Sequence, residues 1–331
     1  MNNKTIKAGV IGLGHLGTIH LKLINELCGE RDDMILAGAF DTDEKKNSEA
    51  AEKYGYEKVG SIDELLGRTD SIVIVTPTST HSDIASKAIE MNVNTFIEKP
   101  VTETTEQAEK LLAMSKGKDI KIQVGHIERF NAAILSLEDY KLAPVFIETH
   151  RLSQFNPRGT DVSVIQDLMI HDIDIILNLV KSPVEKIDAN GVAIITDKID
   201  IANARITFEN GCVANITASR ISQNKMRKMR LFQKSAYISI DFLQNTSEVF
   251  KLAAADETVS GFALTGFEKD GKKMSIVYDR PQVKEVNSLK HELTLFFDSI
   301  VNGTETVVTL EDGLQALEVA NTIIEKIESK I

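Results

Sequence analysis

The sequence predicts a chain of two domains, an α/β domain followed by an α+β domain. In about the first third, short apolar runs rich in β-branched residues alternate with helical patterns, which is typical of a parallel sheet covered by helices on both faces. From about Gly125 on, shorter alternating segments separated by turn signals indicate a mostly antiparallel sheet with a covering helix. A length of 331 residues also exceeds that of one typical core.

The first domain, expected over residues 1–124, contains five apolar runs and four helical patterns. The expected strands cover 8–11, 34–40, 71–75, 94–97 and 120–124. The expected helices cover 15–27, 44–54, 82–91 and 103–116. Because several of these runs are continuously apolar, we expect a doubly wound parallel sheet that is buried on both faces.

The second domain, expected over 125–286, combines one long helical pattern with short alternating segments. The expected helix covers 162–180, and the expected strands cover 145–151, 202–208, 213–219, 229–232 and 236–242. Residues 244–286 carry no pattern that predicts a particular element. Two final helices, 288–301 and 311–329, belong to a C-terminal segment, 287–331, that we expect to pack back near the first domain.

The composition limits the kinds of partner. With 38 basic and 49 acidic residues, the net charge is −11, which argues against a general nucleic-acid or membrane surface. Two distant cysteines, Cys28 and Cys212, offer no disulfide framework, and no clustered ligands indicate a metal. The polar start and short first apolar run resemble neither a signal peptide nor a membrane span. We therefore expect a cytoplasmic protein without metal, membrane or nucleic-acid partners.

A glycine-rich loop directly follows the first apolar run. The loop consists of Gly12, Leu13, Gly14, His15, Leu16 and Gly17. In a G-x-G-x-x-G turn the first glycine permits the tight turn, the second lets backbone N–H groups approach a pyrophosphate, and the third lets helix and strand pack closely. The positive end of the following helix also faces the phosphates. This loop predicts a Rossmann-type dinucleotide-binding domain, in which His15, like His20 behind it, is expected to occupy a variable position.

An acidic residue ends the second expected strand. Asp41 lies 24 residues after Gly17, near the offset at which a carboxylate binds the ribose hydroxyls of NAD. Asp43 follows, and no arginine is near to receive a 2′-phosphate, so NAD is favoured over NADP. The alternative is that Asp41 caps a turn before the next helix.

Three further motifs follow in order along the chain. They are Thr76-Pro77-Thr78-Ser79-Thr80-His81, Glu98-Lys99-Pro100 and the segment from Asp167 to Asp174. With the glycine loop, these motifs resemble the glucose–fructose oxidoreductase/inositol dehydrogenase (Gfo/Idh/MocA) family over nearly the whole chain. The resemblance implies an NAD-dependent dehydrogenase acting on CH–OH groups. Beyond the glycine loop, the cofactor-binding residues that it implies are Asp41, Thr76, Pro77, Thr78, His81, Glu98 and Lys99.

Lys99 follows a strand at its carboxyl end, where open α/β sheets bind ligands. From position alone, a lysine there is either a solvated loop residue or a cation that points into a cleft. The family resemblance implies that Lys99 hydrogen-bonds the substrate hydroxyl, helps to place the nicotinamide and stabilises a developing alkoxide.

Asp167 and His171 are four residues apart, so on a helix they share one face. A carboxylate beside an imidazole makes a general base near neutral pH, although the same spacing is also typical of a surface ion pair. The resemblance implies catalysis: His171 takes the proton of a secondary alcohol, assisted by Asp167, and the hydride passes to NAD. Asp174 is expected to be structural, and Asp172 is expected to face water.

The segment before Asp167 bears on the substrate. Many family members carry a run of glycines just before the catalytic aspartate, where this chain has residues 161–166. The preceding segment, 150–159, is similar to the nucleotide-sugar branch that oxidises the 3-hydroxyl of UDP-N-acetylglucosamine. Arg151 and Arg158 flank a loop in this segment, and their guanidinium groups suit a diphosphate, although solvated loop charges are an equal alternative. Arg129 lies at the expected domain junction and is a further substrate-binding candidate, together with Lys99 and His171.

Other functions remain open from the sequence. They are a dehydrogenase of free sugars or inositols, a glycosidase that uses NAD transiently, and a non-catalytic NAD-binding regulator, which the retained Lys99, Asp167 and His171 disfavour. A basic run over 225–234 alternates with Met229, Leu231 and Phe232 and predicts a strand with one solvated face. Contact of this face with an anionic substrate or with a neighbouring subunit is the alternative. The resemblance also implies that an open face of the second sheet pairs subunits into a homodimer or homotetramer.

Overall fold

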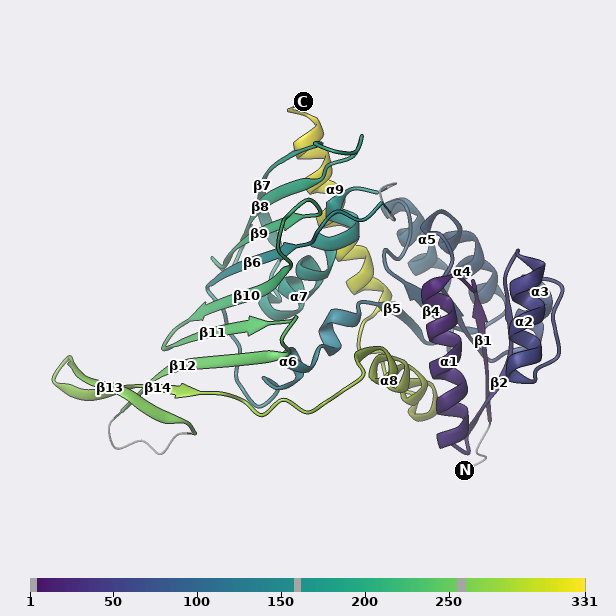
Figure 1. The fold of residues 1–331 in the computed structure, drawn as a ribbon, viewed down its shortest axis with the longest axis horizontal. Helices are drawn as coiled ribbons and strands as arrows, with labels where there is room; N and C mark the ends of the chain where they lie inside the picture. Colours follow the sequence, from purple (N-terminus) through teal and green to yellow (C-terminus); the bar gives the residue numbers. More distant parts are fainter. Residues whose placement is uncertain (1–4, 158–161, 255–259, 331) are drawn as a thin grey trace. The chain divides into compact units, whose positions relative to one another are not determined.

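The computed structural model describes residues 5–157, 162–254 and 260–330. Contacts divide the chain into two compact units, one formed by Met1–Ile127 with Asn287–Leu317 and the other by Glu128–Val286 with Glu318–Ile331. Each unit is built around one sheet (Figure 1). The predicted combination of a Rossmann-type parallel sheet and a mostly antiparallel sheet is therefore confirmed.

The first unit contains a parallel sheet with the strand order β2-β1-β3-β4-β5. Its strands are β1 (Ile6–Ile11), β2 (Met34–Phe40), β3 (Ser71–Ile74), β4 (Asn94–Glu98) and β5 (Ile122–Gly125). Its helices are α1 (His15–Glu30), α2 (Glu44–Tyr54), α3 (Ile62–Arg68), α4 (His81–Glu90), α5 (Thr105–Ser115) and α8 (Ser288–Asn302). From β1 the chain first adds β2 on one side and then crosses to add β3 on the other side. In doubly wound sheets, ligands bind at the carboxyl ends of the strands where the strand order reverses in this way.

Helices cover both faces of the first sheet. Ala8 and Val10 of β1 belong to a buried cluster with the apolar face of α1 and with Phe296 and Phe297 of α8. Gly9, between them, points the other way, toward Leu65 of α3. This arrangement explains why β3 is buried along its whole length and why its sequence is continuously apolar.

Side-chain caps fix several helix starts in the first unit. Asp43 accepts hydrogen bonds from backbone N–H groups at the start of α2, and Thr104 and Gln107 form a capping box at α5. Ser61 caps α3, a seven-residue helix that the sequence analysis missed. The spacing of Ser61 and Glu64 was the available signal, because Ser-x-x-Glu is a capping-box pattern.

The second unit contains a sheet with the strand order β13-β14-β12-β11-β10-β6-β9-β8-β7 in the described residues. Its strands are β6 (Phe146–Leu152), β7 (Val184–Val192), β8 (Ile201–Phe208), β9 (Val213–Ser219), β10 (Met226–Gln233), β11 (Ala236–Asp241), β12 (Thr246–Ala254), β13 (Phe262–Lys269) and β14 (Lys272–Asp279). Strands β6 and β9 run parallel, and the other neighbours in this order run antiparallel. Strands β7, β12, β13 and β14 were not predicted.

The two faces of the second sheet differ. Ile147 and Thr149 of β6 are buried on the face against which α7 (Ile170–Val180) packs, whereas Phe146 and Glu148 are partly exposed on the opposite face. The basic strand β10 also alternates, with Met229 and Leu231 buried. Within one chain, the other face of β10 is thus exposed, as predicted.

The position of Phe232 in that alternation was not the expected one. Phe232 lies on the partly exposed face with Arg230, because side chains an even number of residues apart share one face of a strand.

The smaller helical elements of this part of the chain are η2 (Ile127–Phe130) and α6 (Ala132–Leu135).

The long helix predicted over 162–180 begins a few residues later than expected, and its first turn is not α-helical. It opens with a π-helical turn, Ile165–Met169, labelled η3, and continues as α7. A sequence pattern cannot separate a π turn from an α turn, because the difference is one extra residue within a single turn. Helix α9 (Leu310–Glu328) begins in the first unit and ends in the second. No helix among the described residues is both long and apolar enough to cross a membrane.

Candidate active site

The glycine loop has the backbone geometry of a phosphate cradle. Gly12 has a φ of +96°, and a Cβ atom at Gly12 would collide with the carbonyl oxygen of Val75. A Cβ atom at Gly17 would collide with the carbonyl oxygen of Gly12. At Gly14, the N-cap of α1, nothing lies within 4 Å of the Cβ position. The middle of the loop is therefore open at the positive end of a helix, which fits a bound pyrophosphate.

A cavity of ≈ 800 Å³ opens in front of this loop, within the first unit. This volume lies in the range of cofactor sites. The predicted cofactor residues that line the cavity are Gly12, Gly14, His15, Leu16, Gly17, Asp41, Thr76 and Pro77. The predicted residues Leu13, Thr78, His81, Glu98 and Lys99 are not among the residues that line it.

Asp41 connects the end of β2 to the glycine loop. Its Oδ2 accepts a hydrogen bond of 2.6 Å from the N–H of Leu13, and its Oδ1 accepts one of 2.8 Å from the N–H of Asp43. The cap of α2 is Asp43, and the bond from the N–H of Asp43 means that Asp41 also caps the turn before that helix, which was the alternative interpretation. Asp41 in addition fixes the glycine loop and lines the cavity, so the two interpretations do not exclude each other.

Lys46 is a cavity residue that the sequence analysis did not identify. Its Nζ lies 3.9 Å from Asp41 Oδ2 and 3.9 Å from Asp43 Oδ2. A cation here partly offsets the repulsion that the two carboxylates exert on an anion. Its place in the first turn of α2, one turn after Asp41, was the available signal.

His81 lies behind the cavity wall. Its ring is buried, with Nδ1 3.0 Å from the carbonyl oxygen of Pro100 and Nε2 2.9 Å from that of Thr76. Burial lowers the pKa of His81, and the two carbonyl oxygens oppose this shift without reversing it. The side chain thus joins the turn after β3 to the turn after β4, rather than facing a ligand in the cavity.

A buried pair lies beneath Lys99. His20 of α1 and Glu98 at the end of β4 are both buried, and His20 Nε2 lies 2.7 Å from Glu98 Oε1. A carboxylate only accepts, so the proton is on Nε2 and the imidazole donates. The other carboxylate oxygen, Oε2, accepts a hydrogen bond of 3.2 Å from the N–H of Lys99, whose peptide bond to Pro100 is cis.

His20 was therefore wrongly expected to occupy a merely variable position. It lies on the buried face of α1, three residues after Gly17, and connects the helix of the dinucleotide loop to the turn that carries Lys99. A histidine on an apolar helix face was the available signal, because a buried imidazole requires a partner.

Asp167 and His171 both lie in the second unit, on the η3–α7 helix. Asp167 is in the π turn and His171 follows in the first turn of α7. Both side chains are partly exposed, whereas Met169 and Ile170 between them are buried. Both residues are thus accessible, as are Gln166 and Leu168 beside Asp167. That Asp167 and His171 share one face rests on their spacing, and their catalytic roles stay predictions.

The next acidic residue on this helix is buried, which corrects the expectation that Asp172 faces water. Asp172 is 2% exposed, and its carboxylate accepts two hydrogen bonds from the guanidinium of Arg151, of 3.1 Å from Nε and 2.8 Å from Nη2. Arg151 also donates to Glu128 at 2.9 Å through Nη1. Burial alone lowers the pKa of Arg151, but the two carboxylates raise it above its ordinary value.

Asp174 is tied in the same way. Arg129 donates two hydrogen bonds to it, of 2.8 Å from Nε and 2.6 Å from Nη2, and both side chains are buried. This fork-to-carboxylate pairing confirms the expected structural position of Asp174. The acidic residues Asp172 and Asp174 hold the helix, and Asp167 and His171 occupy its accessible side.

These ion pairs correct the expectation for Arg151. Arg151 was expected either to bind a diphosphate or to be solvated, and it is instead 2% exposed inside the second unit. A buried guanidinium that left its carboxylates for a phosphate would leave those carboxylates as unpaired buried charges. Arg129 directs its guanidinium to Asp174, and its role toward the substrate stays a prediction. Arg158 lies outside the described residues.

The residues described between 5 and 330 contain no group of three or more His, Cys, Asp or Glu side chains that could hold a metal ion. The cysteines Cys28 and Cys212 are free thiols.

Comparison with known proteins agrees with these features. Residues 6–126 match the family model of the GFO/IDH/MocA oxidoreductases with an NAD-binding Rossmann fold, and residues 123–238 match the GFO/IDH/MocA C-terminal domain. The chain belongs to the Gfo/Idh/MocA oxidoreductase family. The expected resemblance, the NAD cofactor and the dehydrogenase class are thereby confirmed.

Named relatives within the family include a close one. UDP-N-acetylglucosamine 3-dehydrogenase of Acidithiobacillus ferrooxidans is 40% identical over 257 residues, which cover 77% of this chain and 80% of the relative. A solved structure with that name and organism matches with a TM-score of 0.86 and 33% identity, over 98% of each chain. Myo-inositol 2-dehydrogenase of Thermotoga maritima is 24% identical over 98% of this chain and 97% of its own.

Proposed function

We propose that this protein oxidises a secondary hydroxyl of a nucleotide sugar, the 3-hydroxyl of a UDP-N-acetylhexosamine. The observation that supports the chemistry is that the titratable side chains of the η3–α7 helix differ in burial and in their partners. Asp172 and Asp174 are neutralised by buried arginines, whereas Asp167 and His171 lie on the accessible face. The substrate is supported by the relative that is 40% identical and by the matching solved structure, both of which carry the name UDP-N-acetylglucosamine 3-dehydrogenase.

The chain's own residues supply binding, orientation and proton transfer. The glycine loop and Asp41 hold the dinucleotide, whose bound nicotinamide supplies the hydride acceptor. His171 accepts the proton of the substrate hydroxyl, Asp167 orients the imidazole and stabilises its charged form, and Lys99 donates a hydrogen bond to the same oxygen. The carbon loses a hydride as the proton leaves the oxygen, so the alcohol becomes a ketone and no further oxidant is needed.

Turnover measurements with purified protein test this proposal. The protein is incubated with NAD or NADP and with UDP-N-acetylglucosamine, UDP-glucose, free hexoses or inositols, and the absorbance of the reduced cofactor is followed. We expect turnover with NAD and UDP-N-acetylglucosamine. Clear turnover with inositol or glucose and none with any UDP-sugar would overturn the substrate. Release of sugar without net reduced cofactor would indicate an NAD-using glycosidase.

His171→Ala serves as the matched variant in the same assay. We expect a loss of turnover of about 100-fold or more, as for removal of a general base, with the dissociation constant for NAD unchanged. A collapse of NAD binding would contradict the assignment of His171 to the substrate side.

We also propose that the protein is a cytoplasmic homo-oligomer that uses the partly exposed face of the second sheet. Directly paired aromatic residues form a continuous row across that face, with ring centroids 5.0 to 5.6 Å apart. The row consists of Phe146, Phe232, Tyr237, Phe250, Tyr278 and Phe262. A contiguous aromatic surface of this kind is typical of protein interfaces.

A further inference from the structure

A buried arginine, Arg220, contacts the chain just before the η3–α7 helix. The sequence did not single out this residue. Arg220 directly follows β9 and is 4% exposed. Its Nη2 donates a hydrogen bond of 2.6 Å to the carbonyl oxygen of Val162, three residues before the π turn η3. The backbone N–H of Arg220 donates to the carbonyl oxygen of Asp200 at 3.0 Å.

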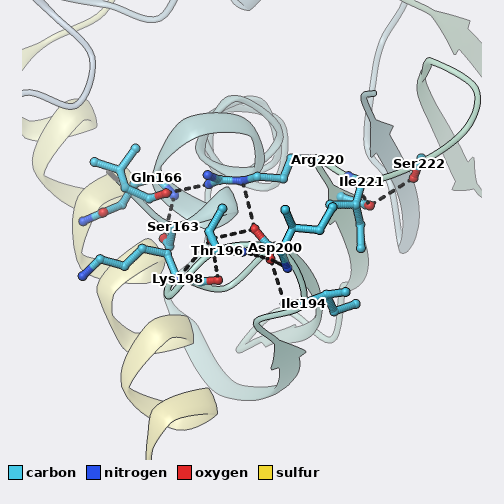
Figure 2. A network of polar contacts seen from close by, with 12 residues as sticks. Ser163, Gln166, Ile194, Thr196, Lys198, Asp200, Arg220, Ile221 and Ser222 are labelled. Atoms are coloured by element: carbon cyan, nitrogen blue, oxygen red, sulfur yellow. Dashed lines mark hydrogen bonds and ion pairs between the residues drawn. The ribbon is translucent and has the colours of Figure 1, made fainter. Parts of the chain in front are cut away.

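Asp200 holds Arg220 and a neighbouring loop together. It is fully buried, and its Oδ2 accepts hydrogen bonds from the backbone N–H groups of Ile194 at 2.7 Å, Ile195 at 2.7 Å and Thr196 at 3.0 Å. Its Oδ1 accepts one of 2.8 Å from the Thr196 hydroxyl and lies 3.9 Å from Arg220 Nε (Figure 2). Burial alone raises the pKa of Asp200, but these donors lower it to about 2. Asp200 therefore stays charged opposite Arg220 at any physiological pH.

Residues 164–167, which connect Val162 to Asp167, form further hydrogen bonds. The N–H of Val164 donates to the carbonyl oxygen of Ile199 at 2.9 Å, and the N–H of Asp167 donates to that of Ser163 at 3.0 Å. Gln166 precedes Asp167, and its Nε2 lies 3.5 Å from Oδ1 of Asn321 on α9. The chain from Val162 to Asp167 is thus fixed at successive points.

We propose that Arg220, held by Asp200, is a positioning residue that fixes the π turn and thereby aims Asp167 toward His171 and the substrate. This inference rests on the proposed function, in which Asp167 orients the catalytic base. A π turn is rarely stable by itself and persists where neighbours fix it, often at functional sites. By fixing the Val162 carbonyl, Arg220 sets where that turn begins, and a one-residue shift of the turn would rotate Asp167 away from His171.

The requirement is specific for arginine. Two nitrogens of the rigid guanidinium contact different groups: Nε lies 3.9 Å from Asp200 Oδ1, and Nη2 donates to the carbonyl oxygen of Val162. A lysine ammonium is a single point at the end of a flexible stem and cannot hold both groups in a fixed relation. Charge alone should therefore preserve folding better than it preserves the position of Asp167.

The test compares Arg220→Met, Arg220→Lys and the matched control Arg280→Met. Arg280 is an exposed arginine of the same unit, after β14. The first measurement is the pKa of the His171 imidazole, by NMR of histidine-labelled protein, with the signal assigned by its loss in His171→Ala. A nearby carboxylate raises the pKa of an imidazole, so we expect a lower pKa in both Arg220 variants and no change in Arg280→Met. This readout requires no substrate, so it stays informative if the proposed function fails.

The second measurement is steady-state turnover of the sugar on which the wild-type protein acts. We expect Arg220→Met and Arg220→Lys to lower kcat by about 10- to 100-fold, the usual effect of displacing a catalytic group by about 1 Å, and to leave the dissociation constant for NAD within about two-fold. Arg220→Lys keeps the charge and is the variant to measure if Arg220→Met does not fold. A lowered melting temperature with an unchanged pKa of His171 would overturn the proposal, because Arg220 would then be structural only.

Discussion

At the scale of single residues, the site depends on where buried charges are neutralised. The η3–α7 helix carries four acidic or basic side chains that could serve as catalytic groups, and the structure separates them by burial. Arg151 and Arg129 engage Asp172 and Asp174, and Asp167 and His171 stay on the accessible side. Spacing alone could place Asp167 and His171 on one face, but it could not show which other acids were already paired.

The pair of His20 and Glu98 gives a prediction at the same scale. His20→Leu leaves the Glu98 carboxylate buried without the imidazole that donates to it at 2.7 Å. We expect the free energy of unfolding to fall by about 1–3 kcal/mol, the usual effect of leaving a buried acceptor without its donor. Chemical denaturation at pH 7 measures this change.

A double-mutant cycle separates this pairing from a packing effect of leucine. In His20→Leu with Glu98→Gln, the charge that would be left unpaired is gone, so the double variant should be more stable than the sum of the two single changes predicts. Strictly additive changes would show that the imidazole and the carboxylate are not coupled.

At the scale of elements, the sequence was most informative where one periodicity ran without interruption. The bounds of β2, α2 and β9 are those expected, because their hydrophobic patterns end at clear turn or cap residues. Strands β12 to β14 were missed because their side chains alternate around aromatic residues that are only partly buried, so neither face carries a clean apolar pattern. The π turn could not be predicted, because long-range contacts such as that between Arg220 and Val162 fix it.

His81 gives a prediction for the elements that it joins. Because burial lowers its pKa below the ordinary 6.5, the unfolded chain binds more protons than the folded one as the pH falls below that value. The contribution of neutral His81 to stability is therefore complete above pH 6.5 and is lost progressively below it. We expect a smaller drop in melting temperature between pH 7 and pH 5 in His81→Gln than in the wild-type protein.

The exposed His15 provides the control for this comparison. His15→Gln removes an imidazole that is exposed in the glycine loop, so it should leave the wild-type pH dependence unchanged. Equal drops in melting temperature in the wild-type protein and His81→Gln would show that the junction between the two turns is not sensitive to protonation.

At the scale of the whole molecule, the two faces of the second sheet differ: α7 packs on one, and the other is partly exposed and is the face that we propose pairs subunits. The row from Phe146 to Phe262 pairs residue by residue across six strands, and its members are only partly covered within one chain. Ion pairs flank it, such as Arg230 with Glu148 at 3.1 Å. Satisfied charges beside an aromatic row allow two copies to meet without burying unpaired charge.

Phe250→Glu tests this surface at its middle. The new carboxylate would stand beside Tyr237 and Tyr278 and on the same face as Glu248, two residues away on β12, so a second copy would have to bury like charges. We expect sedimentation velocity to give a multiple of the chain mass for the wild-type protein and a mass shifted toward the single chain for Phe250→Glu. Ile35→Glu makes the same change at an exposed apolar residue of β2 and should leave the mass unchanged. A wild-type monomer, or a Phe250→Glu protein that keeps the wild-type mass, would remove this face as the subunit interface.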